Sequence, residues 1–144
     1  MTAFHQPDYP RPQMARKQWQ SLNGTWDFRF DDERRGEAEH WFEDLGGHQH
    51  ILVPFSYESA LSGIGDPRNH PCLWYRRSLF FEPGELEGIN LLLHFEGCDF
   101  ETKVWVNGRE AGVHRGGYAR FSFDITDLVQ VGGNSLTAEA KDSY

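Results

Sequence analysis

His48 and His50 have a spacing that could support metal binding. Only one residue separates them, so on a strand both imidazoles would lie on the same face, where they could share a metal ion. No third-ligand motif accompanies them. We therefore interpret both histidines as structural or solvent-exposed, and we predict no metal site and no cofactor.

Three acidic side chains raise the question of acid and nucleophile catalysis. Glu96, Asp99 and Glu101 are close in sequence, and two carboxyl groups held about 5–5.5 Å apart can act as acid and nucleophile. These three flank Gly97 in a pattern typical of a bend between strands, where carboxylates are normally solvated. No catalytic residue is predicted in this chain.

Aromatic residues suggest a different chemistry, because aromatic rings pack against the C–H faces of sugars while polar side chains bind the hydroxyls. Trp26, Trp74 and Trp105 lie within strand patterns, and large aromatics dominate sandwich cores. We interpret these three as core or domain-interface residues. Tyr57 lies in a long loop instead and is the freer candidate for substrate binding.

The elements that would position these residues are mostly strands. Asn107-Gly108 separates two short extended runs and is the dipeptide that best tolerates a type I′ hairpin turn. Branched and aromatic residues predict about eight strands, at 25–30, 51–54, 73–81, 90–95, 102–106, 110–113, 119–124 and 135–141. Short strands separated by frequent turns indicate an all-β antiparallel sandwich.

Three other segments complete this organisation. Residues 1–20 hold Pro7, Pro10 and Pro12 without an apolar period, which predicts an extended arm before a domain at 21–144. The segment 37–45 places apolar residues at i, i+3, i+4 and i+7 before two glycines, which predicts one short helix. The irregular stretch 56–71 is long for a compact domain, where such loops are usually functional or mobile, so it is the first place to look for a site.

Composition limits the partners. The 144 residues include 14 Lys and Arg against 22 Asp and Glu, for a net charge of −8, which argues against a nucleic-acid surface. No apolar run approaches the length of a membrane span. Two cysteines, Cys72 and Cys98, and an opening without a secretion signal predict a cytoplasmic protein with free thiols. A Cys72–Cys98 disulfide is the alternative if the two strands are neighbours.

Several sequence blocks in a fixed order also resemble a known family. The blocks are LNGTWDFRF (22–30), VPFSYESALSGIG (53–65), WYRRSLFF (74–81), LHFEGCDFETKVWVNG (93–108), GGYARFSFDIT (116–126) and GGNSLTAEAKDS (132–143). Together they resemble the amino-terminal sugar-binding domain of glycoside hydrolase family 2, which contains β-galactosidases, β-glucuronidases and β-mannosidases. The resemblance implies a jelly-roll, galactose-binding-like sandwich and a parent retaining enzyme that hydrolyses terminal β-glycosidic bonds.

The same resemblance implies where function lies. Both catalytic glutamates of the family are in a downstream TIM barrel reached through an immunoglobulin-like domain, so the domain described by this sequence is expected to be non-catalytic. Asp142 resembles the family's aspartate that reaches the substrate hydroxyls, although local chemistry alone fits a turn-forming aspartate equally well. The domain would brace the barrel and shape its pocket, and could also form homo-oligomer contacts. The alternatives are a free-standing carbohydrate-binding module and a purely structural interaction domain.

Overall fold

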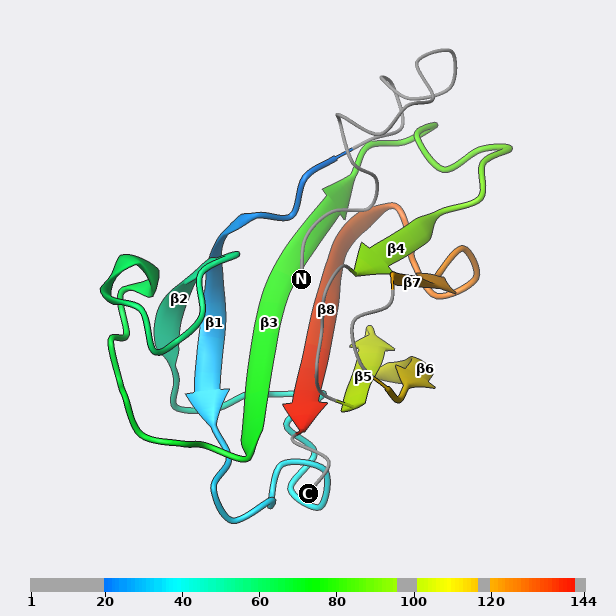
Figure 1. Cartoon of the computed structure of the whole chain (residues 1–144). Coiled ribbons are helices and arrows are strands. Elements are labelled where there is room, and N and C mark those ends of the chain that lie inside the picture. The colour runs from blue at the N-terminus through cyan, green and yellow to red at the C-terminus, as the bar shows by residue number, and fades with distance from the viewer. Residues whose placement is uncertain (1–19, 96–100, 117–119, 142–144) are drawn as a thin grey trace.

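The computed structural model describes residues 20–95, 101–116 and 120–141. Its strands are β1 (Gly24–Phe30), β2 (Gln49–Val53), β3 (Cys72–Phe81), β4 (Leu92–Phe95), β5 (Glu101–Val106), β6 (Arg109–His114), β7 (Phe121–Asp124) and β8 (Gly132–Lys141). Six of them form an antiparallel sheet in the order β2-β1-β3-β8-β5-β6, and β4 pairs with β7 in a second sheet (Figure 1). All eight predicted strands are confirmed, with small shifts at their ends.

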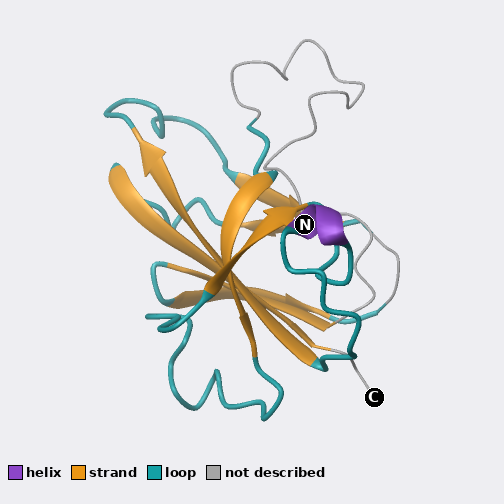
Figure 2. Ribbon diagram, turned by 90° about the vertical axis from the view of Figure 1, so that its left-hand side faces the viewer, coloured by secondary structure: helices purple, strands orange, loops and turns teal. Residues whose placement is uncertain are grey.

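The main core lies where inward-facing side chains of the two sheets meet. Trp26 and Phe28 of β1 are buried together with Leu93 and Phe95 of β4. Because strand side chains alternate between faces, the same period brings Leu136, Ala138 and Ala140 of β8 into this core. The fold is therefore the expected β-sandwich, in which strands make up nearly all of the regular structure (Figure 2).

A second apolar cluster covers the outer face of the six-stranded sheet. It consists of Trp41, Leu45, Cys72, Trp74 and Trp105. Trp74 is stacked on Trp105 with ring centroids 5.2 Å apart, so the prediction that the strand tryptophans are core residues is confirmed. The turn segment 31–45 lies over these rings. The part of β3 beneath it is therefore buried on both faces, with Leu73 in the main core and Trp74 in this second cluster.

The predicted helix at 37–45 is wrong, because this stretch forms consecutive turns. His40 has a φ of 58°, in the left-handed region, which interrupts a right-handed helix. The amide of Trp41 bonds to the carbonyl of Gly36 instead of continuing an i to i−4 ladder. Upstream, the Asp31 carboxylate accepts the Gly36 amide at 2.8 Å. The apolar period instead reflects the packing of Trp41 and Leu45 on the sheet. Among the described residues, the one helix is the short η2 (Ala60–Ser62).

The Asn107-Gly108 turn between β5 and β6 is confirmed. Asn107 and Gly108 have φ values of 53° and 78°, and Val106 pairs with Arg109 across the two-residue turn. The Asn107 side chain donates to the Leu128 carbonyl at 2.9 Å. The turn thus also ties this hairpin to the loop before β8.

Two further predictions meet the limits of the described chain. Most of the proline-containing arm at 1–20 lies outside the described residues, as does Cys98. Among the residues that the structure places, no helix combines the length and apolar character needed to cross a membrane.

Candidate functional site

The carboxyl end of β8 is the part of the fold to which the sequence directs attention. Asp142 lies outside the described residues, but it directly follows Lys141, the last residue of β8. In the sheet register Lys141 is opposite both Cys72 at the start of β3 and Glu101 at the start of β5. The turn segment 31–45, cyan in Figure 1, lies beside this end of the sheet.

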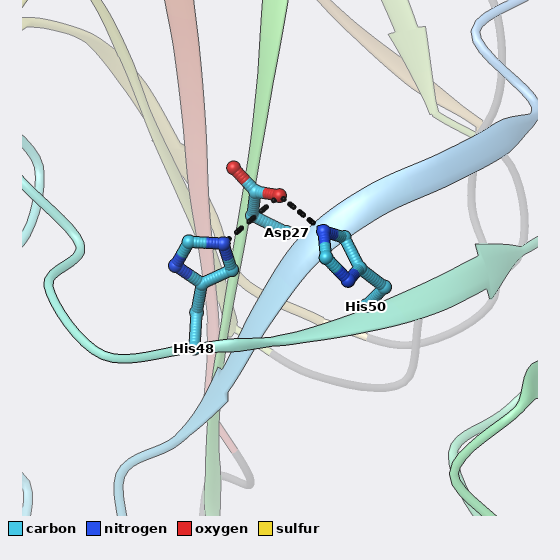
Figure 3. A group of neighbouring side chains, drawn as sticks. All are labelled: Asp27, His48 and His50. Carbon is cyan, nitrogen blue, oxygen red and sulfur yellow. Dashed lines mark ion pairs between the residues drawn. The ribbon is translucent and has the colours of Figure 1, made fainter.

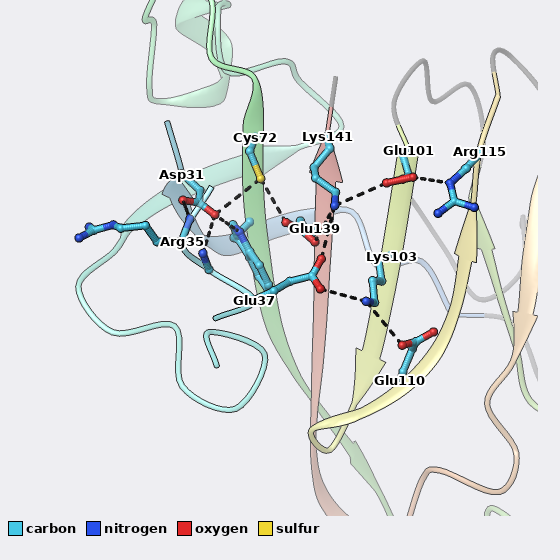
Figure 4. A network of polar contacts seen from close by, with 12 residues as sticks. Asp31, Arg35, Glu37, Cys72, Glu101, Lys103, Glu110, Arg115, Glu139 and Lys141 are labelled. Atoms are coloured by element: carbon cyan, nitrogen blue, oxygen red, sulfur yellow. Dashed lines mark hydrogen bonds and ion pairs between the residues drawn. The ribbon is translucent and has the colours of Figure 1, made fainter. Parts of the chain in front are cut away.

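Lys141 is held by carboxylates from three elements. Its Nζ atom lies 3.4 Å from Glu37, 3.5 Å from Glu101 and 4.0 Å from Glu139 (Figure 4). Burial alone would lower the pKa of Lys141, but the surrounding carboxylates outweigh it and raise the pKa. Lys103 on β5 bridges the other oxygen of Glu37 at 3.0 Å. The strand end that leads to Asp142 is therefore anchored in an ion-pair network.

Glu139 is a buried carboxyl group in this network, with 2% of its surface exposed. Its Oε2 accepts a hydrogen bond from the Cys72 thiol at 3.3 Å. Its Oε1 is buried, and among the described residues no hydrogen-bond partner within contact distance meets the geometry of a hydrogen bond to it. Burial first, and then the adjacent Glu37, raise the pKa of Glu139 to about 8. A protonated Glu139 can donate to Glu37, and this hydrogen bond, with a contribution from Lys103, lowers the pKa of Glu37 to about 2 against the opposing effect of burial. The pair shares one proton at neutral pH.

Asp31, Cys72 and Glu139 place ligand-type atoms within 4.8 Å of one another, yet their chemistry fits hydrogen bonding. The Asp31 carboxylate already accepts from the Trp74 ring at 2.9 Å and from two backbone amides. Burial and the Glu139 carboxylate raise the pKa of the Cys72 thiol, so the thiolate that a metal requires is disfavoured.

Tyr57 lies in the loop 56–71, but its side chain is buried, with 6% exposed. Its hydroxyl donates to the Arg68 carbonyl at 3.2 Å and accepts the His70 amide at 3.1 Å. These bonds close the loop on itself. A direct contact between Tyr57 and a sugar stays a prediction, while the visible role of the residue is to shape the loop.

His70 ties the same loop to the segment after β1. Its Nδ1 lies 2.7 Å from Asp32 and its Nε2 lies 3.0 Å from Asp66. Carboxylates only accept hydrogen bonds, so each of these two contacts needs an N–H on the ring nitrogen that faces it. The ring also stacks on Phe30 at a centroid distance of 3.7 Å. Sequence reasoning missed this bridge because its partners are 38 and 4 residues away.

Comparisons with known proteins agree with this architecture. Residues 19–140 match the family described as "Glycosyl hydrolases family 2, sugar binding domain". The β-glucuronidase of Bacteroides fragilis is 33% identical over 129 residues, which cover 88% of this chain and 17% of that protein. A β-galactosidase of Thermoanaerobacter pseudethanolicus is 41% identical over 71 residues, covering 49% of this chain and 9% of its own length.

Solved structures give the same result. The Ruminococcus gnavus β-glucuronidase superposes with a TM-score of 0.76 at 26% identity, over 85% of this chain and 20% of that one. In sequence alone, the human β-glucuronidase is 29% identical over 133 residues, which represent 86% of this chain and 20% of the human protein. The chain thus spans about a fifth of the length of these relatives.

Proposed function

The chain belongs to the sugar-binding domains of glycoside hydrolase family 2, and from that premise we propose that it serves a larger retaining β-glycosidase as a non-catalytic domain. In this proposal it braces a TIM-barrel catalytic domain, connected through an immunoglobulin-like domain, and borders the substrate pocket. Its crossed strand order supports a jelly-roll, galactose-binding-like assignment. The buried thiol of Cys72 supports a cytoplasmic location.

The anchored end of β8 carries this proposal. Lys141 is held by three carboxylates, so the end of β8 is fixed in place. We propose that Asp142 extends from there to accept hydroxyls of the substrate. Hydrogen bonds to a charged acceptor are worth about 1.5–3 kcal/mol each, enough to matter for transition-state binding.

Loop 56–71 supports the role in domain contact. Leu61, within η2, is 67% exposed, and Phe55 just before the loop is 38% exposed. Apolar side chains presented on a loop that Tyr57 and His70 hold in shape fit a surface that packs against a neighbouring domain. The proposed contribution of Tyr57 is therefore to support this pocket wall.

The experiment compares Asp142→Ala with the matched control Asp127→Ala in the full-length enzyme, since Asp127 is exposed in the loop before β8. We expect the Asp142 variant to lose roughly ten- to several-hundred-fold in kcat/KM, because 1.4 kcal/mol is a factor of ten. The control should retain the parent value. Assays with aryl β-glucuronide and aryl β-galactoside would also identify the sugar class.

Two results would count against this function. Full activity of the Asp142→Ala enzyme, combined with a lower melting temperature of the domain, would make Asp142 a turn residue. Saturable binding of glucuronic acid or galactose to the isolated domain, measured by calorimetry at millimolar concentration or better, would favour a free-standing carbohydrate-binding module instead.

A further inference from the structure

Asp27, His48 and His50 converge on the outer face of the sheet at the β1–β2 edge (Figure 3). The Nε2 atom of His48 lies 3.3 Å from Asp27 Oδ1, and the Nε2 atom of His50 lies 3.4 Å from the same oxygen. One oxygen and two imidazole nitrogens thus lie within 4.8 Å of one another. This group shares no residue with the network around Lys141 and plays no part in the proposed function.

Strand pairing brings the three side chains together. Asp27 of β1 is directly opposite His50 of β2 in the register, and His48 precedes His50 by two residues, which places both histidines on one face. Asp27 points away from the core because its neighbours Trp26 and Phe28 point into it. The missing third ligand of the His48–His50 pair therefore comes from the adjacent strand, where the sequence motif could not show it.

The ring of His48 is already oriented for ligation. Its Nδ1 lies 2.8 Å from the Gly46 carbonyl, and because a carbonyl only accepts, Nδ1 carries the proton. In the neutral ring, Nε2 then directs its lone pair at the Asp27 carboxylate. Two acceptors that face each other at 3.3 Å need either a proton or a metal ion between them, and a metal ion could also bind His50, which faces the same oxygen at 3.4 Å. A backbone carbonyl on the other ring nitrogen is the arrangement that metal-ligating histidines commonly show.

The two nitrogen-to-oxygen spacings at Asp27 match those around a tetrahedral ion. Zinc bonds of about 2.0–2.2 Å that meet at the tetrahedral angle hold ligand atoms roughly 3.3–3.5 Å apart, and the two measured nitrogen-to-oxygen distances are 3.3 and 3.4 Å. Imidazole donors favour zinc, copper and nickel over calcium and magnesium, which take oxygen ligands.

We propose that Asp27, His48 and His50 form a binding site for one divalent transition-metal cation, with zinc as the best-fitting ion. The three protein ligands leave a fourth position open. The side chains of His48 and His50 are 34% and 67% exposed, so this position faces water. A bound ion would also cross-link β2, the edge strand of the sheet, to β1.

The test uses the 144-residue chain without an affinity tag. Calorimetric titration with zinc chloride at pH 7.5 should show one site of micromolar affinity, and cobalt chloride should give the visible absorption of a tetrahedral ion. His50→Gln, His48→Gln and Asp27→Asn should each weaken zinc binding at least tenfold. The matched control is His40→Asn, which alters an exposed histidine that faces the single carboxylate of Glu43.

Three outcomes would overturn the proposal. They are the absence of zinc binding to the wild-type chain at millimolar concentration, equal affinity in the wild type and all three site variants, and an equal loss in the His40→Asn control. Circular dichroism of each variant checks that it is folded. Should His48→Gln unfold, the surface-exposed His50→Gln variant still decides the result.

Discussion

Replacing Glu139 with glutamine should remove a pH dependence from the stability of the domain. The buried Glu139 has a pKa of about 8, above the value near 4.5 of a free glutamate, so the folded chain keeps a proton that the unfolded chain releases. Stability contributed by this group is complete below about pH 4.5 and is lost as the pH rises toward 8. Glutamine carries no titrating proton but can still donate to Glu37.

The magnitude follows from one retained proton. Stability changes by about 1.4 kcal/mol per pH unit for each proton by which the folded and unfolded states differ. Between pH 5.5 and 7.5 the wild type should therefore lose roughly 2–3 kcal/mol relative to Glu139→Gln. The Glu139 side chain is 3% exposed, so solvent screening reduces this value little. The partner Glu37 has a lowered pKa of about 2, so its contribution to stability has the opposite pH dependence. That contribution is lost as the pH drops from about 4.5 toward 2.

Urea unfolding at pH 5.5, 6.5 and 7.5 gives the free energy of unfolding of the wild type and of Glu139→Gln. The difference between the two proteins at each pH removes the contributions of groups that titrate alike in both. Glu110→Gln serves as the control, because Glu110 is 52% exposed in its pair with Lys103 and such pairs contribute little. A difference between Glu139→Gln and wild type that stays constant with pH would refute the reasoning, since it would mean that Glu139 is ionised in the folded protein.

Three further changes test individual contacts by thermal and urea unfolding. Gly108→Val forces a β-branched residue into a φ of 78° and should cost about 1 kcal/mol or more; unchanged stability would contradict the turn geometry. Gly36→Ala places a Cβ 2.4 Å from the Trp74 ring and should lower the free energy of unfolding by about 1–3 kcal/mol. A neutral effect would mean that the turn segment can move off the sheet. Tyr57→Phe leaves the Arg68 carbonyl without its donor and should cost about 1–3 kcal/mol, with faster amide exchange in loop 56–71; exchange as slow as in the strands would argue against that role.

Local patterns were sufficient to predict the strands, because alternation along a strand depends only on nearest neighbours. In β1, for example, the alternating Trp26 and Phe28 are both buried. The Asn107-Gly108 turn could be predicted for the same reason, since its two positive φ angles depend on the local dipeptide. The family resemblance, carried by several blocks in order, was likewise sufficient to identify the domain.

The candidate site depended more heavily on tertiary contacts. Asp142 could be proposed from resemblance, but the anchoring of Lys141 involves Glu37, which is 104 residues away in the chain. Tyr57 could be placed in its loop, yet its burial against Arg68 and His70 depends on how that loop folds back. No local pattern carries such information.

The sequence by itself determined which residues share a strand face, and only the tertiary structure decided what covers that face. The period of 37–45 could not distinguish a helix from a turn segment that packs Trp41 on the sheet. The burial of Glu139 also depends on tertiary contacts, because a polar residue on an outward face is solvated unless another segment covers it. Its raised pKa and the meeting of Asp27 with His48 both arise from side chains on different strands. Strand pairing and layer packing, which act between distant parts of the chain, determine these features.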